Sequence, residues 1–514
     1  MIIGGSLSGF VVSSGVTLEV SGGTVSNTTV LGGGTLELLA GARQSGTTKI
    51  SSGGTLEIGG GETLSGYRVS GSITLALVGG SASNTIVSAG NKLYVASGGQ
   101  ATSTAVLNGG LEVVSTGGTA NGVVVSAGGT FEWVGGNPSV SGAIFRPGAI
   151  LEAGSGYAAG GSVSSAITLK VLSAGTYGRG TVLSGGVADI FTGGIASTVT
   201  ISKGGKLIVF SGGTAIDLAV SSGGSAIASS GGAVELVGTD TTSGLSLPNG
   251  GILEVGSGYT LSNFTVSKGI TLDVLPGGTA NGATVKGGGL EIVSDGGFEH
   301  GATVSSGGTF AAIGSAQVGG DTFLGGAVVE FGSGFAHPIS GAPLSGVAVQ
   351  FLILSGGTLG GGEAQRANVV TVRSGGLASG FAVDSAAKLF LLSGGTGTDL
   401  TVSAGGSAVA SSGAVVELLS GDTTSRITLL SGAILEVESG ATLTSQTVSK
   451  GVTLVIASGG TASGGTSRPA ASASSNPAAR SSTPAAGTET STSTAAALLR
   501  SPVSISPAPA PVRG

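Results

Sequence analysis

Few residues in this chain of 514 amino acids have the chemistry of a catalytic centre. Histidine occurs only as His300 and His337, and there is no cysteine. The chain therefore contains almost none of the residues that a catalytic triad or a thiolate nucleophile requires. It also contains no glycine-rich phosphate loop and no HExxH zinc motif. Both histidines are expected to be solvated surface residues. We predict that the protein is not an enzyme, with no catalytic, cofactor-binding or metal-binding residues and no cofactor.

Carboxylates offer a second kind of chemistry, because they recur at steps of 18 to 20 residues. Each follows a large apolar residue, so we place all of them in one outward-facing column. In adjacent turns they would lie about 5 Å apart, where each neighbour repels by about 0.8 kcal/mol in water. Such ladders are able to recruit Ca²⁺ or Mg²⁺, but we favour a solvated face that blunts lateral strand pairing. The runs are Glu19, Glu37 and Glu57; Glu112, Glu132 and Glu152; and Glu235, Glu254, Asp273 and Glu291.

One further motif resembles a cation site. Residues 394–402 read GGTGTDLTV, which looks like a calcium-binding nonapeptide. Such sites need consecutive copies to complete the coordination, and the neighbouring residues do not repeat this motif. We therefore predict no calcium site there.

The composition indicates what kind of fold must carry these residues. Glycine accounts for 104 residues, and aromatic residues make up only 4%. This is too few large side chains for the wide core of an ordinary globular domain, yet 40% hydrophobic residues exclude a disordered chain. Glycine does not recur at every third residue, so collagen is excluded as well. A thin, repetitive fold remains.

A repeating phrase defines the elements of that fold. A glycine-rich turn is followed by alternating small polar and aliphatic residues, as in SSGGTLEIG (51–59) and VSKGITLDV (266–274). The alternation has the period of 2 that is typical of a half-buried strand. The phrase returns about every 19 residues, and we assign two short strands to each unit. Because so small a unit cannot bury its aliphatic face alone, the units must stack.

These features predict an all-β fold: a single-chain parallel β-solenoid (β-helix) of about 19-residue turns, with about 24 turns in residues 1–464. The regular step between outward residues is interrupted twice by a gap of 27 residues, and the column continues at Glu235 and at Glu417. The sequence from Gly212 also matches that from Gly394 at an offset of 182. Threonines that follow the turns, such as Thr17, Thr35 and Thr55, are expected to form ladders.

The composition changes after residue 464. Residues 465–514 hold 7 of the 13 prolines but only 3 of the 104 glycines. We expect this Pro/Ala/Ser/Thr-rich segment to be a disordered tail. Its origin stays open between a genuine linker and an out-of-frame reading of a repeat gene.

Charge and hydropathy limit the partners. The net charge is −6 and no cluster of Lys and Arg marks a surface for phosphate, so nucleic acid is not an expected partner. No apolar run approaches the roughly 20 residues that span a bilayer, so no transmembrane segment is predicted. Residues 1–10 (MIIGGSLSGF) lack the basic region and cleavage site of a signal peptide.

The repeats carry a resemblance to a known family. SSGGTLEI, FSGGTAIDLAV (from Phe210) and LPGGTANGATV (from Leu275), together with the 19-residue step, resemble the strand-loop-strand repeats of autotransporter passengers of the AIDA-I and antigen 43 type. The resemblance covers about residues 10–464. The chain contains no segment recognisable as a signal peptide or translocator barrel, so we expect a passenger fragment.

The resemblance implies a function and a location. It implies a bacterial surface adhesin, at the cell surface or extracellular, that mediates self-association and attachment. Its expected partners are copies of itself and host or abiotic surfaces. The alternative is an inert structural stalk, or a degenerate fragment of a larger autotransporter with no activity of its own.

Overall fold

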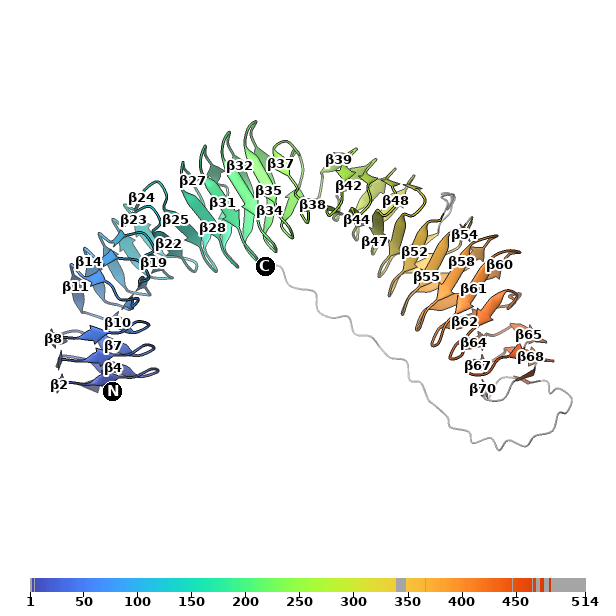
Figure 1. The fold of residues 1–514 in the computed structure, drawn as a ribbon, viewed down its shortest axis with the longest axis horizontal. Helices are drawn as coiled ribbons and strands as arrows, with labels where there is room; N and C mark the ends of the chain where they lie inside the picture. Colours follow the sequence, from blue (N-terminus) through green and yellow to red (C-terminus); the bar gives the residue numbers. More distant parts are fainter. Residues whose placement is uncertain are drawn as a thin grey trace.

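The computed structural model describes residues 2–3, 5–338, 348–365, 367–445, 447–464, 466–467, 472–475 and 480–481. These residues form short strands joined by tight turns, with no helix among them. The strands of successive turns pair in parallel, and the stack curves into an arch (Figure 1). The predicted all-β parallel β-solenoid is therefore confirmed.

Most turns contain three strands rather than the predicted two. One turn runs through β4 (Thr17–Val20), β5 (Thr24–Ser26) and β6 (Thr29–Val30) before β7 (Thr35–Leu38) stacks on β4. The break between β5 and β6 falls at Asn27, whose φ of 48° turns the chain. Residues with positive φ thus divide what the sequence shows as one run of alternating residues into two strands.

Three long sheets succeed one another along the chain. The N-terminal sheet consists of β1 (Ile2–Ile3), β4, β7, β10 (Thr55–Ile58), β13 (Thr74–Leu77), β16 (Lys92–Val95), β19 (Leu111–Val114), β22 (Thr130–Trp133), β25 (Ile150–Ala153), β28 (Thr168–Val171), β31 (Val187–Ile190), β33 (Lys206–Val209), β35 (Ser225–Ala228) and β37 (Leu245–Ser246).

The central sheet consists of β26 (Ala158–Ala159), β27 (Ser162–Val163), β29 (Thr176–Gly178), β30 (Thr181–Val182), β32 (Ile195–Ile201), β34 (Thr214–Val220), β36 (Ala233–Leu236), β38 (Ile252–Val255), β41 (Thr271–Val274), β44 (Leu290–Val293), β47 (Thr309–Ala312), β50 (Val328–Phe331), β52 (Gln350–Ile353), β55 (Val369–Val372), β58 (Lys388–Leu391), β61 (Ser407–Ala410) and β63 (Ile427–Leu429). The C-terminal sheet consists of β51 (Ala336–Pro338), β53 (Thr358–Gly360), β56 (Leu377–Ser379), β59 (Thr396–Thr398), β62 (Val415–Leu418), β64 (Ile434–Val437), β67 (Thr453–Ile456) and β70 (Ser472–Ser475).

Two smaller sheets form the other faces of the turns between residues 260 and 323. The β39–β48 sheet consists of β39 (Thr260–Ser262), β42 (Thr279–Asn281), β45 (Phe298–His300) and β48 (Gln317–Gly319). The β40–β49 sheet consists of β40 (Thr265–Val266), β43 (Thr284–Val285), β46 (Thr303–Val304) and β49 (Thr322–Phe323).

The two 27-residue gaps mark a change of face, not a pause in one column. Ile208 pairs with Ile227, which lies one turn later in the N-terminal sheet. Glu235 follows Ile227 closely in the chain but pairs with Ile216 in the central sheet. The same passage recurs in the later copy of this sequence, where Val409 belongs to the central sheet and Glu417 to the C-terminal sheet. The predicted single column is therefore wrong, because its residues lie on three different sheets.

Aliphatic side chains form the core in stacked columns. Leu18, Leu36, Leu56 and Leu75 lie on adjacent strands, and each is almost completely buried. Since most turns repeat this arrangement, each of them buries its apolar face only against its neighbours. Stability is therefore distributed along the stack, and a single unfavourable residue acts locally.

Glycines at the corners let successive backbones approach each other. The amide of Gly33, which has a φ of 78°, donates to the carbonyl of Gly53 at 2.8 Å, and Gly15 donates to Gly33 in the same way. At the next residue, Gly34, an added Cβ would lie 2.7 Å from the carbonyl oxygen of Val12. The first glycine supplies the left-handed conformation and the second leaves room for the preceding turn.

Three strands lie beyond residue 464. β69 (Thr466–Ser467), β70 and β71 (Arg480–Ser481) pair with strands of the preceding turn, β70 in register with β67. The described stack thus runs about one turn past the expected boundary. The rest of the expected disordered tail lies outside the described residues. No helix that is long and apolar enough to cross a membrane occurs in the described part of the chain.

Candidate functional site

The first acidic run lies where it was predicted. Glu19, Glu37 and Glu57 occupy β4, β7 and β10, pair in register and are partly exposed. Burial and the charge of Glu19 raise the pKa of Glu37, and burial and the charge of Glu37 raise the pKa of Glu57. Like charges therefore stack along this face, as the sequence indicated.

The second run is only partly acidic. Glu132 and Glu152 pair in register, and their outward column continues into Lys170 and Asp189. Lys170 Nζ lies 3.1 Å from Glu152 Oε1 and forms an ion pair. Burial and the charge of Glu152 raise the pKa of Glu132, whereas the charge of Lys92 lowers it. This ladder contains a lysine among its carboxylates and therefore attracts a cation less strongly than a purely acidic column would.

The third run lies on the central sheet. Glu235, Glu254 and Asp273 pair in register on β36, β38 and β41. The hydroxyl of Ser294 donates to Asp273 Oδ1 at 2.7 Å. Burial raises the pKa of Asp273, and this hydrogen bond acts in the opposite direction.

Two residues predicted to face outward face inward instead. Glu112 pairs with Leu93 and Phe131 in the core column, and Glu291 pairs with Leu272 and Phe310. Both are completely buried. The placement of Glu112 and Glu291 in the outward column was therefore wrong.

The reason is a shift of one residue after the corner glycines. In turns such as those of Glu37 and Glu57 the sequence after the second glycine is Thr-Leu-Glu, and the third residue faces outward. After Gly110 and Gly289 it is Leu-Glu, so the glutamate takes the second position, which faces inward. Counting from the corner glycine, rather than from one acidic residue to the next, would have found this difference.

Glu112 lies between large apolar side chains with no compensating group. Its strand neighbours in the column are Leu93 and Phe131, and neither carboxyl oxygen has a hydrogen-bond partner in the described protein. Burial raises the pKa of Glu112 to about 8. The side chain is therefore protonated at neutral pH, because the interior penalises its charge.

Glu291 has a second buried carboxyl beside it in the same turn. Glu299 on β45 faces inward between Ala280 and Val318, and sequence analysis did not single it out. None of the four carboxyl oxygens accepts a hydrogen bond of normal geometry from a described donor. Burial raises the pKa of both carboxyls, and that of Glu299 is raised further by the charges of Glu291 and Asp321. Both carboxyls therefore favour the protonated form, and the two groups titrate as a pair.

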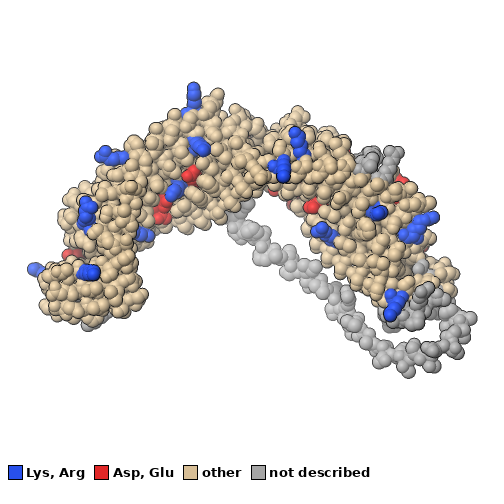
Figure 2. All heavy atoms as spheres, viewed as in Figure 1, with Lys and Arg blue, Asp and Glu red and all other residues tan. Residues whose placement is uncertain are grey.

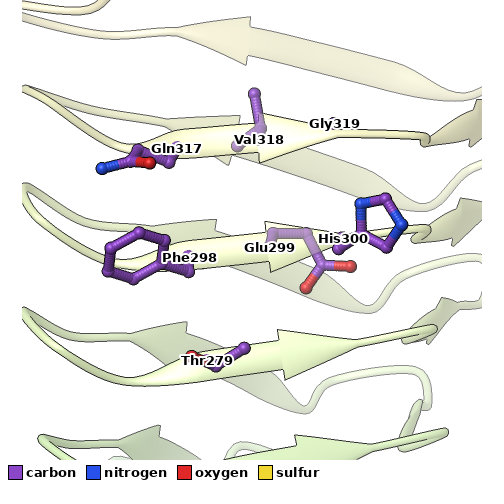
Figure 3. A pocket seen from close by; sticks show the side chains of 7 residues that line it. All are labelled: Thr279, Phe298, Glu299, His300, Gln317, Val318 and Gly319. Carbon is purple, nitrogen blue, oxygen red and sulfur yellow. The ribbon is translucent and has the colours of Figure 1, made fainter.

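A shallow depression lies on the outer side of the same turn. It has a volume of about 350 Å³ and is lined by residues of β42, β45 and β48. Figure 3 shows Thr279, Phe298 and Gln317 on three successive strands, with His300 at the other end of the Phe298 strand. His300 is exposed, as predicted. His337 lies in β51, but its side chain is outside the described part of the structure.

Charged side chains are otherwise scattered. Figure 2 shows them as separate spots on a largely uncharged surface. Over the residues that the structure describes, no three or more His, Asp or Glu side chains are grouped so that they would hold a metal ion. The geometry thus describes a repetitive solenoid with polar outward ladders.

Comparison with known proteins finds a family that part of this solenoid resembles. Residues 65–129 match the AIDA family, described as adhesin of bacterial autotransporter system, probable stalk. The predicted resemblance to AIDA-type passengers is thereby confirmed. No curated protein matches the chain.

A solved structure also matches. It is the crystal structure of a hyper-glycosylated TibA fragment, residues 55–350, whose glycosylation was catalysed by TibC. The match has 20% sequence identity and covers 82% of this chain and 100% of that chain, with a TM-score of 0.12. At that TM-score the two structures do not superpose as wholes, so this match carries no argument about function.

Proposed function

We propose that the chain is the passenger of an adhesin-type autotransporter, displayed at the bacterial cell surface, where it holds cells together through contacts with copies of itself. Attachment to host or abiotic surfaces would use the same faces. The family match over residues 65–129 supports the adhesin class. The observation that carries the proposal is the register of the solenoid, which repeats the same outward positions turn after turn.

Registered polar columns suit weak, multiple contacts. Thr17, Thr35, Thr55 and Thr74 pair in register on the N-terminal sheet. A second column, of four threonines, follows the β40–β49 sheet: Thr265, Thr284, Thr303 and Thr322. When two such faces meet, small contact energies add in register, so avidity arises without a strong local site.

The acidic columns set a condition on how two copies meet. Two identical faces that carry Glu19, Glu37 and Glu57 repel each other when they align in parallel. An antiparallel or offset arrangement, or a divalent cation between the faces, removes this repulsion. Glu112 and Glu291 take no part, because both are buried.

Cell settling tests the proposal. The chain is displayed on a strain that does not aggregate, and settling is followed with and without a chelator. Settling is expected in at least one condition. If the chelator abolishes it, Glu19, Glu37 and Glu57 are replaced together by glutamine, which should make settling independent of the chelator. The matched control replaces the column of Glu235, Glu254 and Asp273 by the corresponding amides.

The alternative is an inert stalk that presents another module. The family description, probable stalk, favours it. Absence of settling in every condition, with display verified by an antibody, would reject self-association in favour of this stalk. Neither proposal assigns the chain an enzymatic activity.

A further inference from the structure

We propose that the depression on the β39–β48 sheet binds a neutral sugar ring, which stacks on the side chain of Phe298. The site is not part of the self-association proposal, since it needs no second copy of the chain. Its residues come from three consecutive strands whose register brings them together: Thr279, Phe298 and Gln317 form one outward column.

Phe298 is unusual for its position. Its side chain is 39% exposed, and every other aromatic residue with described burial is more covered. The same column holds Thr260, Thr279 and Gln317 in the neighbouring turns, so the solenoid itself does not require an aromatic residue there. Single exposed apolar residues are common, but this one lies in a depression with polar side chains on both sides.

The side chains of the lining are complementary to a neutral ring that carries several hydroxyl groups. The face of a phenyl ring carries partial negative charge, which attracts the C–H groups on the apolar face of a sugar. The amide of Gln317 and the hydroxyl of Thr279 lie on either side of Phe298, and His300 lies at the other end of its strand (Figure 3). These groups are both donors and acceptors, as sugar hydroxyls require.

The lining disfavours ions. Its only carboxylate residue is Glu299, which is 3% exposed and faces inward in a column with Ala280. It contains no Lys or Arg to hold an anion. At Gly319 the column of Asn281 and His300 has no side chain, which leaves the depression open beside the imidazole. A neutral ligand with hydroxyl groups is therefore the best match.

Binding can be followed through the histidine signals, because the chain has only two histidines and His300 is part of the lining. The full chain is labelled with ¹³C at histidine Cε1, and His337→Gln assigns the two signals. Methyl β-D-galactopyranoside, methyl α-D-mannopyranoside and methyl N-acetyl-β-D-glucosaminide are titrated separately. At least one is expected to move the His300 signal in a saturable manner and to leave the His337 signal in place.

Substitutions test whether the shift of the His300 signal depends on Phe298. Phe298→Thr places the residue of the preceding turn in this column and should weaken binding at least tenfold. Gln317→Ser should weaken it to a smaller extent. Phe390→Thr, at an outward position of β58, is the matched control and should leave binding unchanged. Circular dichroism verifies that each variant keeps its strands.

Four results would overturn the proposal: no saturable shift with any of the three glycosides, full binding by a folded Phe298→Thr variant, equal binding of cyclohexanol, or binding of glucuronic acid alone. Equal binding of cyclohexanol would indicate a merely apolar patch. Binding of glucuronic acid alone would indicate a site that recognises negative charge. These outcomes concern the purified chain and leave the settling experiment unaffected. The absence of settling would likewise not change the sugar titration.

Discussion

Replacing Glu112 by glutamine should stabilise the solenoid at alkaline pH and have little effect at acidic pH. Glu112 is completely buried without a hydrogen-bond partner, and burial raises its pKa from 4.5 to about 8. Because one pKa unit corresponds to about 1.4 kcal/mol, the charged form costs the folded state on the order of 5 kcal/mol.

The sign follows from where the proton is bound. Between pH 4.5 and about 8 the folded chain keeps the proton of Glu112 and the unfolded chain has released it. Stability is therefore greatest below pH 4.5, falls as the pH rises to about 8, and changes no further above that value for this group. Glutamine has nearly the same shape and does not titrate, so it removes this decline.

Hydrogen exchange is the suitable assay, since turns of a solenoid open locally. Exchange of amides in β16, β19 and β22 is compared at pH 5 and pH 9, corrected for the intrinsic rate. Glu112→Gln should slow exchange there by 10-fold or more at pH 9 and leave it nearly unchanged at pH 5. Glu132→Gln, in the outward column of the next turn, is the matched control and should slow exchange much less, because Glu132 is only partly buried. Equal exchange of wild type and Glu112→Gln at pH 9 would refute the reasoning.

Three further predictions follow from other parts of the stack. Glu299→Gln should reduce the loss of stability between pH 5 and pH 9 in β44 and β45, because burial raises the pKa of both Glu291 and Glu299; an unchanged pH profile of exchange there would contradict the buried pair. Lys170→Ala should lower the free energy of unfolding by about 1 kcal/mol or less, since its ion pair with Glu152 is partly exposed; a denaturant titration that gives a several-fold larger loss would show that the pair matters more. Deletion of residues 465–514 should leave the melting temperature within about 2 °C, because this Pro/Ala/Ser/Thr-rich segment has almost no aliphatic clusters; a larger drop would mean that it caps the stack.

Much of the outward pattern was predictable because local rules repeat in every turn. Glu19, Glu37 and Glu57 follow the same Thr-Leu motif after the corner, so their alternation places them in one column. The exposure of His300 was also predictable, because a histidine in a polar repeat is usually a solvated surface residue. Glu299 and Phe298 could not be assigned in the same way, since the short strand Phe-Glu-His alternates with either phase and only its neighbours Ala280 and Val318 identify the inward residue.

By itself, the sequence determined the kind of fold: glycine-rich corners, alternation of period 2 and a 19-residue step allow a parallel solenoid, because a unit so small is stable only when stacked. Only the tertiary structure decided which face each residue occupies. The phase of alternation restarts at every corner, where one residue more or less reverses inward and outward, as it does at Glu112 and Glu291. The pairing of Glu235 with Ile216 depends on a strand one turn away, which no local pattern in the chain records.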